Sequence, residues 1–217
     1  MLLAEALLLL AIDPDSGRPV NSSEQPLTPC LNGALVAELA LGGMVQLEGK
    51  RFAVTGQLPP AGLLRDAHES LASPKGRRAE DQLRRMDKQV DRVWKRVVDG
   101  LVERGVLDRD ARGLWRLTAH PVLRPELRDE VVTRVRAAAA GNREIEPRTA
   151  VVLALAGPAR LLEVVADKPH DHAKRRIAEA TESTPVAGVV KKVIAEAAAA
   201  AAAATAATAG AVAASSS

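Results

Sequence analysis

The chain has 217 residues, of which 47% are hydrophobic but only 1% aromatic, and it contains no tyrosine. A core made of Leu, Val, Ile and Ala is easiest to build from packed helices, so we expect a mainly α, single-domain protein. The one cysteine, Cys30, excludes an internal disulfide and fits a reducing cytoplasm. No strongly apolar, charge-free run of about 20 residues occurs, which argues against a transmembrane helix.

Apolar residues at helical spacing predict a series of helices. The first is Leu2–Ile12, which ends at the Asp13–Gly17 turn and precedes a proline-rich loop over residues 18–30. The later ones are Ala61–Ala72, Arg77–Glu103, Arg124–Ala140, Arg148–Ala156, Ala159–Val165, Asp171–Ala180 and Pro185–Glu196. Residues 195–217 form a low-complexity tail rich in alanine and serine, so we place the folded domain at residues 1–194.

A short pattern occurs twice, in Gly33–Val54 and in Lys95–Thr118. In both copies an amphipathic segment ends at a glycine, Gly43 or Gly105, which suits the left-handed residue that closes a helix. An apolar pair, a charged turn with glycine and a second apolar segment then follow, as is typical of a β-hairpin. We therefore predict two small hairpins. The second carries Trp115 among arginines and is predicted to project from the helical body.

Positive charge is concentrated in one segment of the chain. The formal net charge is +3 in total, yet Lys75–Arg96 alone holds nine basic residues against four acidic ones. Such a field favours polyanions: nucleic acid, anionic lipid headgroups or phosphorylated partners. The structural alternative is a solvated helix face.

No residue pattern points to catalysis. Phosphate-binding loops, dinucleotide fingerprints and zinc-helix motifs do not occur, and His170 and His172 would point apart on a helix rather than share a metal. We therefore predict a protein that is not an enzyme and needs no cofactor or metal. Glu38 and Arg148 lie in very apolar segments, where half-buried charges are expected to form structural ion pairs.

One functional hypothesis is a winged-helix protein that binds DNA. A long basic helix followed by a hairpin with Arg109, Arg112 and Arg116 suits it, as does a pI near 9.3. However, a recognition helix normally follows another helix after a short turn, whereas Ser73–Gly76 is a proline-glycine break. The C-terminal half would also have no role in such a module.

The other hypothesis is a peripheral membrane protein. Arg92, Lys95 and Arg96 would contact lipid phosphate, while Leu114 and Trp115 at the second hairpin would enter the headgroup layer. The alternative for Trp115 is a contact in the core or in a homo-oligomer formed through this hairpin, since tryptophan is common in both settings.

Four segments resemble a known family in this order: LLLLAIDPDSG, LNGALVAELALGGMVQLEG, LVERGVLDRDARGLWRLTAHP and PRTAVVLALAGPARLLEVV. Together they resemble the Golgi phosphoprotein family of phosphoinositide-binding adaptors, which has bacterial members, over roughly Leu2–Ile194. The resemblance implies a helical domain with a projecting hairpin. It also implies a cytoplasmic, membrane-associated adaptor that binds phosphatidylinositol 4-phosphate and has no enzymatic activity.

The positions of the family's headgroup pocket carry different residues here. The resemblance places its arginine at Asn32, its tryptophan near Ser23, and its two helical basic residues at Asp91 and Trp94. The neighbouring cations keep this helix basic. The predicted headgroup-binding residues are Asn32, Arg92, Trp94, Lys95 and Arg96. The predicted membrane or oligomer residues of the hairpin are Arg112, Leu114, Trp115 and Arg116.

Overall fold

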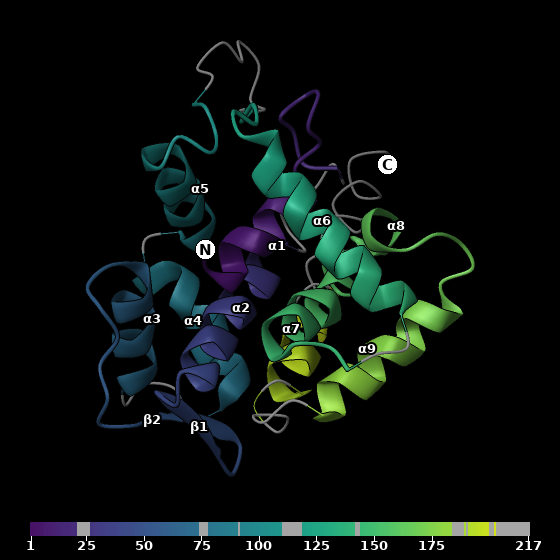
Figure 1. Ribbon diagram of the computed structural model, residues 1–217. Coiled ribbons are helices and arrows are strands. Elements are labelled where there is room, and N and C mark those ends of the chain that lie inside the picture. Colours follow the sequence, from purple (N-terminus) through teal and green to yellow (C-terminus); the bar gives the residue numbers. More distant parts are fainter. Residues whose placement is uncertain are drawn as a thin grey trace, which may run out of the picture.

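A wholly buried helix lies at the centre of the fold (Figure 1). The computed structural model describes residues 1–20, 27–73, 78–90, 92–109, 119–141, 144–183, 189, 191–199 and 202. Every residue of α1 (Leu3–Ala11) is buried, because α2, α5, α6 and α7 all pack against it. A helix that is apolar on every side can only be stable in such a position.

The other elements follow in chain order and agree with a mainly α, single-domain protein. They are α2 (Leu27–Leu41), β1 (Val45–Glu48), β2 (Arg51–Val54), α3 (Leu63–Ala72), α4 (Ala79–Gln89), α5 (Val93–Glu103), α6 (Pro125–Ala140), α7 (Pro147–Ala156), α8 (Leu162–Val165) and α9 (Asp171–Ser183). The described residues 191–199 are also helical. The predicted helices at the first segment and at α3, α6, α7 and α9 are confirmed within a few residues.

Both glycine stop signals are confirmed as helix caps. Gly43 and Gly105 have φ angles of 71° and 65°. The N–H of Met44, the residue after Gly43, donates to Leu39 O at 2.8 Å, and that of Val106 donates to Leu101 O at 2.9 Å. This six-residue closure is the Schellman motif, and it turns the chain sharply after α2 and after α5.

The first hairpin is confirmed, and it covers the helical body. Strands β1 and β2 pair antiparallel with Val45 opposite Val54. The side-chain amide of the buried Gln82 in α4 accepts from Phe52 N–H and donates to Phe52 O, both at 2.8 Å. It therefore imitates a strand edge and fixes β2 against α4.

The prediction of one long helix over Arg77–Glu103 is wrong. Two helices, α4 and α5, replace it, and Arg92 before α5 has a φ of 60°. The chain changes direction here because α4 packs on α2, α3 and β2, whereas α5 packs on α1 and α2. Asp87 supports the change: its carbonyl accepts Arg92 N–H at 2.9 Å and its carboxylate accepts Val93 N–H at 3.1 Å.

Two other boundaries differ from the prediction. Helix α2 begins at Leu27, so residues 27–30 are not loop; Pro29 is tolerated because the first helical turn needs no N–H donor. Helix α8 begins at Leu162 rather than Ala159, after Arg160 with a φ of 59°. The division into residues 1–194 and 195–217 stays a prediction.

Two carboxylates hold the N-terminal end of α1. The N–H of Leu2 donates to Glu5 Oε2 and the N–H of Leu3 donates to Glu38 Oε2, both at 2.7 Å. Arg104 Nη2 lies 2.6 Å from Glu5 Oε1, and Arg148 forms an ion pair with Glu38. The predicted ion pairing of Glu38 and Arg148 is thereby confirmed, and the two residues are each other's partner.

We predict that Arg148→Ala destabilises the protein by about 2 kcal/mol, because it leaves the nearly buried Glu38 carboxylate without a cation. The matched control is Arg134→Ala, which removes an exposed i,i+4 pair with Glu130 and should cost less than about 0.5 kcal/mol. Urea unfolding at constant m-value measures both. Equal losses for the two variants would contradict the role assigned to Arg148.

Candidate functional site

The predicted basic residues surround the change of direction between α4 and α5, which we call the α4–α5 corner (described residues 84–90 and 92–96). Arg92 precedes α5, and its side chain is exposed. Lys95 is also exposed, with its Nζ 3.8 Å from Asp99 Oδ2. Arg96 is half-buried, and its guanidinium is engaged within the fold, since its Nη2 donates to Asp66 Oδ2 in α3 at 2.8 Å. Arg92 and Lys95 are therefore the more accessible cations.

Helix α4 adds cations that the sequence analysis counted but did not assign to the site. Arg84, Arg85 and Lys88 are exposed, and they fall within an arc of about 100° around the helix. Arg84 pairs with Asp81 at 2.6 Å. Arg85 and Lys88 form no ion pair within the described part of the chain, so their charge is open to a partner. The apolar residues Leu83 and Met86 mark the buried face of α4. The sequence could therefore have placed Arg85 and Lys88 on the opposite, solvent-facing side of this helix.

Asn32 and Trp94 are placed differently from the cations. Asn32 is only 3% exposed, and its Nδ2 donates to Leu83 O at 3.0 Å, so it joins α2 to α4. Trp94 is half-buried against the hydrophobic core. Cys30, two residues before Asn32 on α2, is buried, and burial raises the pKa of its thiol to about 12. Asn32 is therefore an interior residue, whereas Trp94 stays partly accessible.

The tip of the second predicted hairpin lies outside the described residues, and so do Arg112, Leu114, Trp115 and Arg116. The residues on either side, 106–109 and 119–123, are described, and we call them the base. Leu107 pairs with Val122, and Asp108 N–H donates to Pro121 O at 2.8 Å. This pairing extends beyond Thr118, where the predicted hairpin ends. Leu123 beside the base is 54% exposed.

The base of the hairpin also rests on the turn after α1. His120 N–H donates to Gly17 O at 2.7 Å. Gly17 has a φ of 65°, and a Cβ there would lie 2.6 Å from Pro121 N, so only glycine fits. The segment that follows the predicted tip is thus anchored to the turn after α1.

Metal binding and membrane spanning have no structural counterpart in the described residues. No three His, Cys, Asp or Glu side chains gather there in a way that could hold a metal ion. His172 Nδ1 lies 3.0 Å from Ala139 O, which gives it a structural contact. No helix in the described ranges combines the length and apolar character needed to cross a bilayer.

The family comparison covers almost the whole described fold. The model of the Golgi phosphoprotein 3 (GPP34) family matches residues 3–197, from the start of α1 to the buried Ala197. No curated protein matches the sequence.

We predict that Asp87→Ala lowers the free energy of unfolding by about 1 kcal/mol, because α5 loses the acceptor for Val93 N–H. Asp87→Asn should keep most of the stability, since its side-chain oxygen can still accept. Chemical denaturation measures both, with Asp81→Ala as the control because, among the described residues, that carboxylate pairs with exposed Arg84. The cap assignment fails if Asp87→Ala costs no more than Asp81→Ala.

Proposed function

Since the chain belongs to the Golgi phosphoprotein 3 (GPP34) family, we propose that it is a non-enzymatic peripheral membrane protein that binds anionic phospholipid headgroups. The binding surface is the α4–α5 corner. The observation that carries the proposal is the cluster of exposed cations there: Arg85, Lys88, Arg92 and Lys95. Each basic residue close to an anionic bilayer contributes about 1 kcal/mol.

Recognition by this corner is mainly electrostatic. A stereospecific site for one phosphate would need several donors converging on it. Asn32 is interior and Arg96 is engaged by Asp66, which leaves flexible, exposed side chains. Phosphatidylinositol 4-phosphate is therefore bound according to its charge, as phosphatidylserine is. Binding weakens as salt rises, because exposed charges are screened.

The second hairpin supplies an apolar anchor in this proposal. Leu114 and Trp115 enter the headgroup layer or the contact with a second copy. Leu123, in the described segment after the predicted tip, is a further exposed apolar residue. Gly17 holds the described segment that follows residues 110–118 in the chain.

We predict that the triple variant Arg85→Glu, Lys88→Glu, Arg92→Glu binds vesicles of phosphatidylcholine and phosphatidylserine at least about 100-fold more weakly. Co-sedimentation at physiological ionic strength measures the loss. The matched control reverses three exposed cations near and on α9, on the other side of α1 in Figure 1: Lys168, Lys174 and Arg175. It changes net charge equally and should weaken binding less than about threefold if the corner is the contact. Equal losses would reject the corner.

A separate prediction concerns the hairpin. Replacing Leu114 and Trp115 by serine should lower vesicle binding or shift the assembly state, because either contact needs their apolar surface. Vesicle co-sedimentation and light scattering read the two outcomes. Leu58→Ser is the control, since Leu58 is an exposed apolar residue elsewhere, at 57%. If neither quantity changes relative to this control, the hairpin has no such role.

A further inference from the structure

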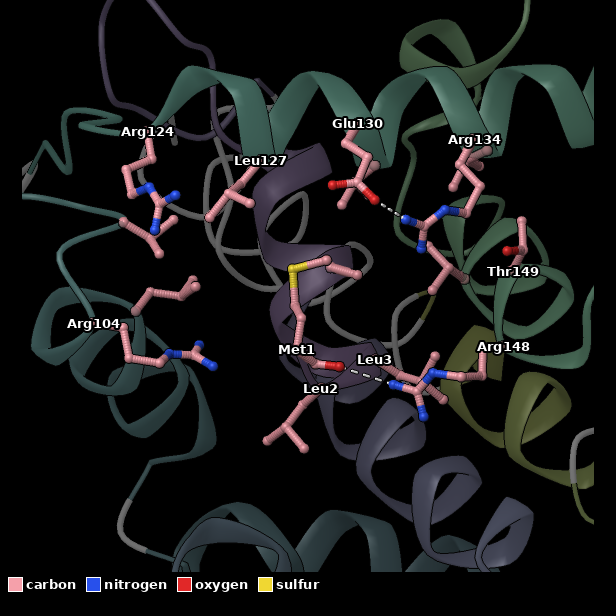
Figure 2. Close-up of a pocket in the computed structure, with 16 residues that line it drawn as sticks. Met1, Leu2, Leu3, Arg104, Arg124, Leu127, Glu130, Arg134, Arg148 and Thr149 are labelled. Carbon is pink, nitrogen blue, oxygen red and sulfur yellow. Dashed lines mark hydrogen bonds and ion pairs between the residues drawn. The ribbon is translucent and has the colours of Figure 1, made fainter.

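A cavity of about 440 Å³ opens beside the N-terminal end of α1 (Figure 2). Residues from α1, α5, α6 and α7 line it, together with five residues beside these helices: Met1, Leu2, Arg104, Val106 and Arg124. None of the residues of the α4–α5 corner belongs to this lining. Its volume lies in the range of small-molecule sites, about 300–1,000 Å³. The cavity is thus separate from the proposed headgroup surface.

The floor of the cavity is apolar. Leu101, Val106, Val131 and Val135 line it, and each is less than 5% exposed. Leu127, Val131 and Val135 follow one another on α6 at intervals of four residues and form a continuous stripe. Arg124 stands three residues before Leu127, at the start of this stripe. From Arg124 to Val135 the stripe measures about 16 Å, which suits an extended alkyl chain.

Four arginines surround the opening, and their partners divide them into two kinds. Arg104 and Arg148 are structural, because they neutralise Glu5 and Glu38, whose side chains are 6% and 12% exposed. Arg124 and Arg134 pair instead with exposed carboxylates on the same stretch of chain, Glu126 and Glu130. Exposed pairs contribute little and exchange readily with another anion.

The two ends of the cavity differ in negative charge. Figure 2 shows Arg104 and Arg124 on one side of Met1, and Arg134 and Arg148 on the other. Glu130 lines the cavity and pairs with Arg134, whereas Glu126 does not belong to the lining. Val106 O accepts the N–H of Leu123 at 2.9 Å, so the chain after Arg104 runs beside the chain before Arg124. An incoming anion therefore meets less repulsion at the Arg104–Arg124 end.

We propose that this cavity binds a single-chain amphiphile with an anionic head, such as a fatty acid. The head contacts Arg124, with Arg104 beside it, and the chain lies along Leu127, Val131 and Val135. A bare inorganic anion would leave the apolar floor unfilled. A neutral chain would leave Arg124 with only its exposed partner. The amphiphile satisfies both parts of the lining.

The test uses dodecanoate as the probe, titrated into the full chain by calorimetry below its micelle concentration. We expect saturable one-to-one binding, and at least about tenfold weaker binding of dodecanol and of inorganic phosphate. Arg124→Gln should weaken dodecanoate about tenfold or more, because a charge-assisted contact is lost. Glu126→Gln should strengthen it, because the competing carboxylate is gone. A damaged fold could only weaken binding, so it cannot explain an increase in Glu126→Gln. Both residues are also exposed, so neither change should disturb the core.

Vesicle co-sedimentation separates this site from the headgroup surface. Arg124→Gln should leave binding to phosphatidylserine vesicles within about threefold of the wild type. Arg85→Gln should weaken vesicle binding and leave dodecanoate binding unchanged. The proposal is overturned if dodecanoate does not bind, if dodecanol binds equally well, or if Arg124→Gln weakens vesicles but not dodecanoate. If Arg124→Gln and Arg85→Gln weaken vesicle binding equally, the assignment of headgroup binding to the α4–α5 corner is contradicted instead.

Discussion

The fold depends on the hydrogen bonds that the backbone N–H groups make at the N-terminal end of α1. The first N–H groups of a helix have no partner within it, and here packed helices surround most of that end. Glu5 and Glu38 accept two hydrogen bonds at this end, and Arg104 and Arg148 neutralise them. Because these four residues come from α1, α2, the end of α5 and α7, one polar cluster fixes the helices that enclose the core.

This cluster also sets the two surfaces to which we assign function. Arg104 holds the C-terminal end of α5, and Asp87 and Asp66 hold its N-terminal end, so the α4–α5 corner presents its cations from a rigid frame. The cavity lies at the opposite end of α5, where Leu101, Arg104 and Val106 contribute to its lining. Arg104 and Arg148 are engaged in ion pairs that stabilise the fold, whereas the exposed cations of the α4–α5 corner can contact a ligand.

Much of the fold could be predicted from the sequence, because the signals were local. Gly43 and Gly105 carry their own conformational preference, and α7 is apolar enough to identify a buried helix. The break before Arg92 could not be predicted, since no Pro or Gly marks it and packing against two different sets of helices causes it. The interior position of Asn32 was equally hidden, as its partner Leu83 is remote in sequence. The cavity could not be predicted either, because its lining comes from four helices that are spread along the sequence.

The most direct test compares three polyanions with the unmodified protein at physiological ionic strength. The protein is titrated with phosphatidylserine vesicles, with vesicles of equal surface charge containing phosphatidylinositol 4-phosphate, and with duplex DNA. We expect similar affinity for the two kinds of vesicle and much weaker binding to DNA. Tight DNA binding with a steep logarithmic salt dependence, without vesicle binding, would contradict it and favour the winged-helix hypothesis.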